Sequence, residues 1–182
     1  NAVAHNYNGG MYQWSNSGGG NNLEMYNCLF YGNEKAAIGS SAVSTLKDFH
    51  NCYIQTASGL SDEVKKYITG PSLNNYYGVN TDLPNPFSAG NSYATDGSIN
   101  LRLLGSSSCV NGGWNNPVNS NNETIDLPKT DADFTDRIQD CTVDIGAYEF
   151  NGAYSITPDE TTSTDKAVYY VTQNGRGTGS AA

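Results

Sequence analysis

Three aspartates in one short stretch, Asp131, Asp133 and Asp136, have the spacing DxDxxD and supply the carboxylate oxygens that calcium prefers. The stretch lacks the glycine and the terminal glutamate of an EF-hand loop, so an acidic surface turn is the alternative interpretation. Calcium is the one cofactor that the sequence suggests. With two histidines and no CxxC motif in the chain, a zinc site is not expected.

Hydrolysis of a glycosidic bond needs two carboxylates that face each other across the bond. The acidic residues in the N-terminal third of the chain are Glu24, Glu34 and Asp48, and their positions predict no pair on one face of a sheet. A lyase needs a base beside a carboxylate. Lys35 and Lys47 belong to no such arrangement, and no GxSxG motif provides a serine nucleophile. The sequence therefore predicts no catalytic residue.

Aromatic residues are better candidates for binding. Alternating apolar residues predict an inward face made of Met11, Cys28, Phe30, Cys52 and Ile54. The same alternation turns four aromatic side chains outward, Tyr12, Trp14, Tyr31 and Tyr53. Outward rings of this kind stack on sugars or pack against a protein partner. Loops of the same chain that fold over the rings are the other interpretation, and the sequence leaves both open.

A repeat positions these residues. The segments LEMYNCLFYGN and LKDFHNCYIQT align, and their Asn-Cys pair recurs after 24 residues, from Asn27 to Asn51. A period of this size fits one coil of a β-solenoid, in which three short strands are joined by turns. Because asparagine tolerates left-handed backbone geometry, both asparagines predict corners, and Cys28 and Cys52 are expected to be neighbours on successive coils. An antiparallel sheet with two similar hairpin strands is the alternative.

The chain changes character after the repeats. The run SDEVKKYI, residues 61–68, predicts a short helix with Ser61 as its N-cap. Residues 111–122 consist mostly of asparagine, glycine, proline and serine and predict a surface loop. Strand character returns at residues 142–150 and at residues 167–172, with a polar stretch between them.

The composition predicts an all-β protein outside the cytoplasm. Tyrosine outnumbers phenylalanine 13 to 5, and only 15% of the residues are charged. A net charge of −9 disfavours nucleic acids and anionic membrane surfaces as partners. No apolar run approaches the roughly 18 residues of a membrane span. An even number of cysteines, four, in a lysine-poor chain favours an extracytoplasmic location.

The segment TVDIGAYEF, residues 142–150, resembles the closing motif of right-handed parallel β-helix surface proteins with a choice-of-anchor Q domain, which are abundant in Bacteroidetes. The upstream segments DLPNPF, NLRLLGSSSCVNGG and TDADFTDR resemble further segments of that family in the same order. They depart from its pattern at Ser108, where proline is usual, and near Asp136, where glycine is expected. The final AVYYVTQNGRGTGS resembles the opening strand of such a domain.

The resemblance implies a right-handed parallel β-helix, with the short helix in an insertion. Residues 1–152 would form its C-terminal coils and cap, residues 153–166 a polar linker, and residues 167–182 the first strand of a following β-helix. A cap covers the open end of a solenoid. In this cap we expect the apolar side chains Ile145, Tyr148 and Phe150, an ion pair between Asp144 and Arg137, and a disulfide between Cys109 and Cys141. The sequence leaves the other cysteine pairings open.

The function predicted from these features is that of a noncatalytic module in a larger secreted bacterial protein, serving adhesion or carbohydrate binding. Its expected partners are a surface glycan or protein and neighbouring β-helix domains of the same chain. The resemblance implies a location at the cell surface, in association with the outer membrane. The alternative is the C-terminal part of a polysaccharide lyase or glycoside hydrolase whose catalytic coils lie upstream.

Overall fold

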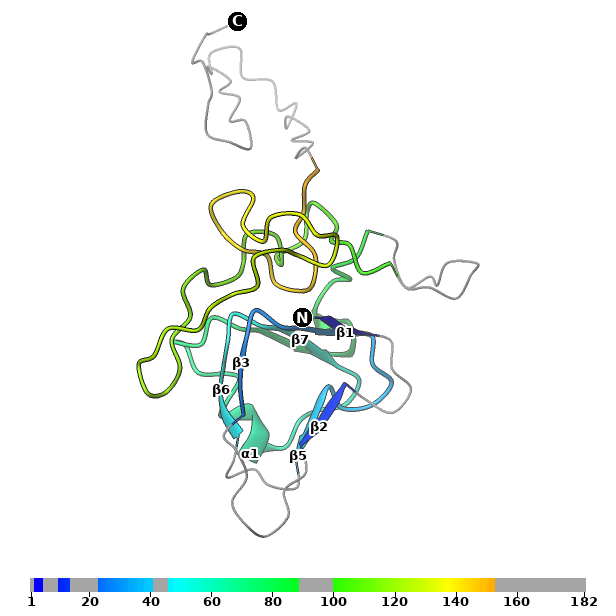
Figure 1. Ribbon diagram of the computed structural model, residues 1–182. Helices are drawn as coiled ribbons and strands as arrows, with labels where there is room; N and C mark the ends of the chain where they lie inside the picture. Colours follow the sequence, from blue (N-terminus) through cyan, green and yellow to red (C-terminus); the bar gives the residue numbers. More distant parts are fainter. Residues whose placement is uncertain (1, 5–9, 14–22, 41–45, 89–99, 153–182) are drawn as a thin grey trace, which may run out of the picture.

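The computed structural model describes residues 2–4, 10–13, 23–40, 46–88 and 100–152 (Figure 1). These residues form short strands and one short α-helix, so the prediction of an all-β chain is confirmed. The predicted linker and final strand, at residues 153–182, lie outside the described residues. The elements are β1 (Ala2–Ala4), β2 (Met11–Gln13), β3 (Leu23–Tyr26), β4 (Leu29–Tyr31), β5 (Ile38–Ser40), β6 (Leu46–His50), β7 (Tyr53–Thr56), α1 (Asp62–Lys65), β8 (Tyr76–Val79) and the 3-10 turn η2 (Asn80–Asp82).

The strands form three short parallel sheets, with the orders β1-β4-β7-β8, β2-β5 and β3-β6. Strands β1, β2 and β3 belong to three different sheets. Strand β4 then pairs with β1, β5 with β2 and β6 with β3. Successive passes of the chain therefore lie side by side (Figure 1). The two aligned repeats pair in parallel, and the antiparallel alternative is wrong.

Asparagines make the corners of these passes. Asn27 and Asn51 have φ angles of 54° and 51°, as predicted, and Asn74 has 53°. Tyr76 pairs with Tyr53, so Asn74 begins a third repeat that the sequence comparison missed. It was hidden because Asn75 stands where the first two repeats have cysteine.

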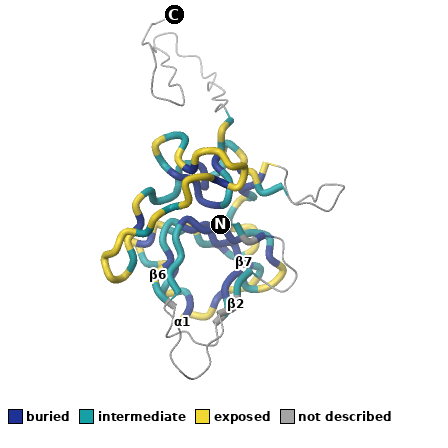
Figure 2. The backbone as a smooth tube through the Cα atoms, in the orientation of Figure 1, coloured by how far each residue is buried: buried dark blue, intermediate teal, exposed yellow. Residues whose placement is uncertain are grey.

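Buried side chains of the three sheets form an inner core, and Figure 2 shows buried segments along the strands that surround it. Phe30, Phe49 and Ile54 are fully buried there. The predicted inward face is confirmed for Cys28, Phe30, Cys52 and Ile54, while Met11 is half-buried against the same core. The segment with α1 covers this core through Leu60, Val64 and Ile68. The predicted helix is confirmed, although it is shorter than expected and the Ser61 side chain makes no capping hydrogen bond.

A second core lies on the other side of the β1-β4-β7-β8 sheet. Leu29 and Tyr53, which alternate with the inner residues, are 0% and 1% exposed. They pack against Phe87 and against residues 100–152, which we call the outer layer. Figures 1 and 2 show this layer alongside the sheet, with buried segments where the two meet. Strands β4 and β7 are therefore covered on both faces.

The closing segment, residues 142–150, does not cover the open end of the inner core as predicted. Residues 142–150 form turns rather than a strand. Ile145 is buried in the second core and Phe150 packs against it, so both cover the face of a sheet rather than the end of the inner core. Tyr148 is half-buried, with the Arg102 guanidinium 5.0 Å from the centre of its ring. Gly146, at a φ of 129°, brings this segment against Leu29 in a conformation that side-chain-bearing residues rarely adopt.

Corner asparagines attach the outer layer to the sheets. The Asn27 side chain donates to Trp114 O (3.0 Å) and accepts from Trp114 N (2.7 Å). The Asn51 side chain donates to Gly112 O at 3.0 Å. Gly146 N donates to the carbonyl of Asn27. Asn27 and Asn51 thus turn the backbone and also satisfy part-buried polar groups of the outer layer.

The cysteines do not form the expected disulfide. All four are free thiols in the structure, and Cys109 is buried in the second core whereas Cys141 is exposed.

Candidate functional site

A cavity of about 440 Å³ opens between the β3-β6 sheet and residues 114–120 of the outer layer. We call it the β3-β6 groove. Its walls combine aromatic rings, carboxylates and polar groups, and those used below are Glu24, Tyr26, Asp48, His50, Trp114 and Ser120.

Strand alternation places the groove residues. Met25 and Phe49 pair in register and contribute to the inner core. Their neighbours in sequence point to the opposite face, so Tyr26 lies beside His50 there, and Glu24 and Asp48 line the same groove. The expectation that no two carboxylates share a face was therefore wrong, because it did not include the 24-residue register between β3 and β6.

Three aromatic side chains form a cluster in the groove. The rings of Tyr26 and His50 are stacked, with centres 5.6 Å apart and an interplanar angle of 6°. Trp114 lies 5.6 Å from His50 and 6.2 Å from Tyr26 and is tilted against both. All three residues are half-buried and line the groove, so part of each side chain remains exposed there to a ligand.

Hydrogen bonds fix the carboxylate of Glu24. It accepts from the Tyr26 hydroxyl at 2.7 Å and from Ser120 N at 3.2 Å. Burial alone would raise the pKa of Glu24, but the hydrogen bonds from Ser120 and Tyr26 outweigh it, and the pKa is lowered. Glu24 is therefore ionised at neutral pH and suited to accept hydrogen bonds rather than to give up a proton.

Tyr26 is held in its protonated form. Burial, the hydrogen bond to Glu24 and the negative charges of Glu24 and Asp48 all raise its pKa. A tyrosine in this state does not serve as the base of a lyase at neutral pH.

The aromatic residues chosen from the sequence do not form this site. Tyr53 is 1% exposed and its hydroxyl donates to Pro84 O, so it is not an outward ligand. Tyr31 is half-buried and meets Phe87 edge-on at 6.0 Å. The interpretation in which other parts of the chain fold over these rings is correct for both. Trp14 and the side chain of Tyr12 lie outside what the structure describes.

The three aspartates stabilise a turn. Asp131 accepts hydrogen bonds from Asp133 N (2.8 Å), Thr135 N (3.0 Å) and Glu149 N (3.0 Å). Asp133 pairs with Arg102, whose Nε lies 2.9 Å from Oδ2, while Asp136 is exposed. Among the described residues, no three acidic, histidine or cysteine side chains are arranged to hold a metal ion. The hydrogen bonds of Asp131 and the ion pair of Asp133 support the acidic-turn interpretation of this segment.

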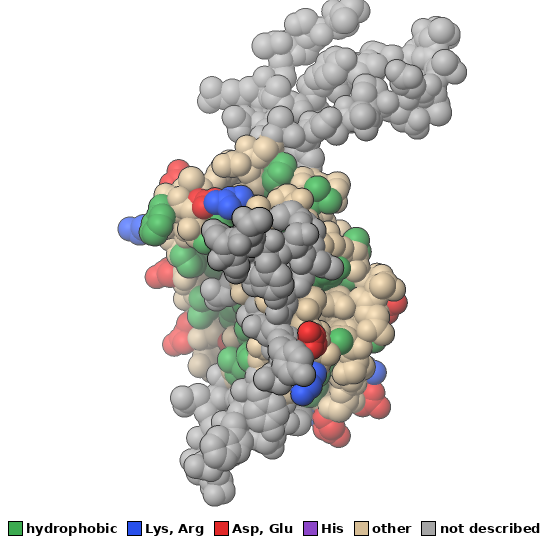
Figure 3. Space-filling model, turned by 90° about the vertical axis from the view of Figure 1, so that its right-hand side faces the viewer, with side chains coloured by type: hydrophobic (Ala, Val, Ile, Leu, Met, Phe, Trp, Pro, Cys, Tyr) green, Lys and Arg blue, Asp and Glu red, His purple; other side chains and the backbone are tan. Residues whose placement is uncertain are grey.

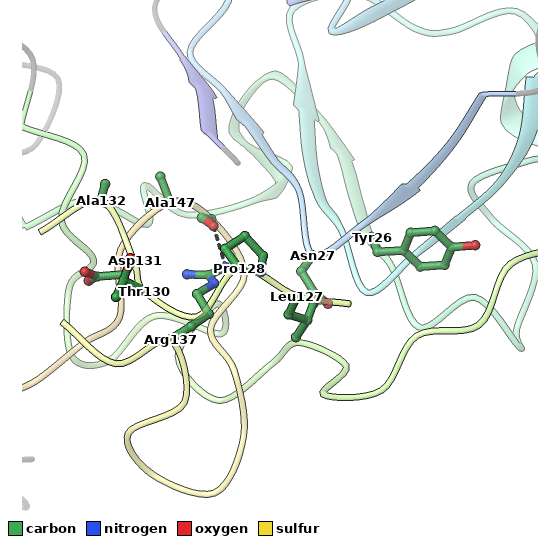
Figure 4. A pocket seen from close by; sticks show the side chains of 10 residues that line it. Tyr26, Asn27, Leu127, Pro128, Thr130, Asp131, Ala132, Arg137 and Ala147 are labelled. Carbon is green, nitrogen blue, oxygen red and sulfur yellow. Dashed lines mark hydrogen bonds between the residues drawn. The ribbon is translucent and has the colours of Figure 1, made fainter. Parts of the chain in front are cut away.

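A second cavity, of about 280 Å³, lies between the outer layer and the corner at Asn27 (Figure 4). Arg137 reaches toward it and donates to Gly146 O at 2.7 Å. Its ion-pair partner is Glu149, with Nη1 and Oε1 2.8 Å apart, and not Asp144 as predicted. The Asp144 carboxylate instead accepts from two backbone N–H groups, those of Asn111 and Phe150.

This buried charge cluster perturbs its acids. Burial and the charge of Asp144 raise the pKa of Glu149 to about 7, although Arg137 opposes the shift. Burial also raises the pKa of Asp144. Because Arg137 pairs with Glu149 and donates to Gly146 O, and Glu149 accepts from Asp144 N, these contacts lie within the outer layer, and we interpret the cluster as the internal support of that layer.

Comparison of the chain with models of known families, with curated proteins and with solved structures gave no match. In the part of the chain that is described, no helix has the length and apolar character needed to cross a membrane. Figure 3 shows one face of the molecule, on which acidic side chains are dispersed among few basic ones, in keeping with the net charge of −9.

Proposed function

We propose that this chain is a noncatalytic, secreted or cell-surface module of a larger bacterial protein that binds carbohydrate in the β3-β6 groove. We further propose that its three sheets are the last coils of a right-handed parallel β-helix, followed by a linker and a second such domain. Parallel pairing at a 24-residue period and left-handed asparagine corners support the architecture. The resemblance of residues 142–150 to a family closing motif supports the bacterial surface.

The aromatic cluster is the observation that carries the proposal. Sugar rings present flat C–H faces that pack on aromatic rings, and Tyr26, His50 and Trp114 lie within 6.2 Å of one another in an open groove. The carboxylates of Glu24 and Asp48 beside them accept hydrogen bonds from hydroxyl groups. A mostly apolar surface with a few placed polar groups is typical of small-ligand sites.

The charges of the groove indicate which class of glycan should bind. Glu24 is ionised, Asp48 is exposed in the same groove, and the chain as a whole is acidic. Lys47 is the single basic side chain that lines the groove among the described residues. Repulsion disfavours uronates and sulfated sugars, so we expect neutral glycans to bind better.

The test is calorimetric titration with neutral hexasaccharides of glucan, xylan and mannan, and with a galacturonan hexasaccharide for comparison. Replacing Trp114 by alanine should weaken binding of the best neutral ligand at least about tenfold, or about 1.4 kcal/mol. The matched control is Phe134→Ala, because Phe134 is an aromatic residue 87% exposed outside the groove. Absence of binding to every sugar, or equal affinity of both variants, would contradict the proposal.

The second candidate is a carbohydrate-active enzyme; its catalytic coils were predicted upstream, and the groove would add a carboxylate pair of this chain to them. The placement of Glu24 and Asp48 in one groove favours it, since glycosidases use paired carboxylates. Incubation with the same oligosaccharides and measurement of new reducing ends distinguishes the two. Release of reducing ends that Asp48→Asn abolishes would establish the enzyme and refute the noncatalytic module.

A further inference from the structure

Cys28 and Cys52 occupy equivalent places on successive passes of the chain. Each follows a left-handed corner asparagine and precedes a paired strand, because Leu29 is in register with Tyr53. The N–H of Cys28 donates to the sulfur of Cys52 at 3.4 Å. Both sulfurs have the same orientation: that of Cys28 lies 3.2 Å from Tyr26 O, and that of Cys52 lies 3.3 Å from His50 O.

We propose that Cys28 and Cys52 are an oxidisable pair and form a disulfide that joins two neighbouring passes of the chain. Adjacent strands lie about 4.8 Å apart, within the roughly 4.4–6.8 Å that separates the Cα atoms of bonded cysteines. The alternative pair has unlike surroundings, since Cys109 is buried in the second core and Cys141 is exposed. The proposal does not depend on carbohydrate binding.

The two sulfurs have different environments in the folded chain. A hydrogen bond from Cys52 lowers the pKa of Cys28 to about 7, although burial opposes the shift. Burial raises the pKa of Cys52 well above its ordinary value. The thiolate is the nucleophile in disulfide exchange, so Cys28 is the more readily ionised of the two sulfurs once their mutual contact has formed.

The oxidant is a low-molecular-weight disulfide, such as oxidised glutathione. The Cys28 thiolate attacks one of its sulfurs and expels one glutathione thiolate, which forms a mixed disulfide. The sulfur of Cys52 then attacks that of Cys28, expels the second glutathione thiolate and completes the new S–S bond. Two cysteine sulfurs are oxidised, one glutathione disulfide is reduced, and the protons of the two cysteine thiols pass to the two glutathione thiolates.

Burial determines when this reaction takes place. Cys28 is 5% exposed and Cys52 is 0% exposed in the folded chain. The side chain of Asn75 lies on the next pass and accepts from Cys52 N at 2.7 Å. Glutathione is excluded from such a site, so oxidation must occur during folding, before this pass and α1 pack over the cysteines.

The experiment is refolding of the complete, reduced and unfolded chain in buffer with oxidised and reduced glutathione. Non-reduced peptides are then mapped by mass spectrometry after the remaining thiols are alkylated. The expected product links the peptides of Cys28 and Cys52 and leaves Cys109 and Cys141 alkylated. A bond between Cys109 and Cys141 without one between Cys28 and Cys52, or four alkylated cysteines, would overturn the proposal.

Thermal melting gives an independent measurement. The bond closes a loop of about 24 residues, which restricts the unfolded chain and should raise Tm by roughly 5–10 °C over the reduced protein. Cys109→Ser should retain this difference between oxidised and reduced protein, and Cys52→Ser should lose it. An equal difference in both variants would show that another bond is responsible. Because the peptide map needs no variant, it decides the proposal even if Cys52→Ser does not fold.

Discussion

Replacing Asn27 by glycine tests whether corner asparagines attach the outer layer to the sheets. Glycine keeps the left-handed backbone angle, so the substitution removes only the side chain. That side chain is 2% exposed and makes two hydrogen bonds with the backbone of Trp114. Each bond contributes about 1 kcal/mol, and the Trp114 groups left without these partners add a further cost, so we expect a loss of about 2–4 kcal/mol.

The matched control is Asn74→Gly. Asn74 has the same left-handed backbone, with a φ of 53°, but it is exposed. Both variants make the unfolded chain more flexible to the same extent, so this effect cancels in their difference. The assay is equilibrium urea unfolding followed by tryptophan fluorescence. Free energies of unfolding that differ by less than about 1 kcal/mol between the variants would refute the attachment through Asn27.

Two further variants test the second core and the buried charges. Leu29→Ala should lower the free energy of unfolding by about 2–5 kcal/mol, because removing the fully buried leucine side chain that faces the outer layer leaves a cavity. A loss below about 1 kcal/mol in urea unfolding would contradict that packing. Glu149, with a pKa of about 7 when folded, binds more protons in the native than in the unfolded state between about pH 4.5 and 7. Its contribution to stability is therefore lost as the pH rises through this window. In melts across the window, Glu149→Gln should show a smaller decline of Tm with pH than the unmodified chain, and an equal decline would contradict the assignment.

Local signals in the sequence were sufficient for the first two repeats. Asn27 and Asn51 predicted corners because the left-handed conformation is a property of the residue itself. Inward Phe30 and Ile54 followed from strand alternation, which is also local. Both inferences needed only neighbouring residues and one recurring spacing.

The groove could not be predicted in this way. Trp114 reaches the corner at Asn27 from 87 residues further along the chain, and it lies in a segment whose composition indicated only a surface loop. Alternation correctly turned Tyr53 away from the inner core, but it carried no information on the outer layer that covers it. Irregular segments lack a period, so the place where they pack is decided by long-range complementarity.

Attachment of the outer layer and construction of the groove depend on the same contact. Trp114 supplies the tilted ring of the aromatic cluster, and its backbone is held on both sides by Asn27, which does not line the groove. If the groove binds carbohydrate as proposed, Asn27→Gly should weaken binding between about threefold and tenfold, because the ordering of Trp114 is then added to the cost of binding. Titration at a temperature where circular dichroism shows the variant folded measures this effect, and Asn74→Gly should bind like the unmodified chain. Unchanged affinity in folded Asn27→Gly would mean that the ligand does not use the position of Trp114.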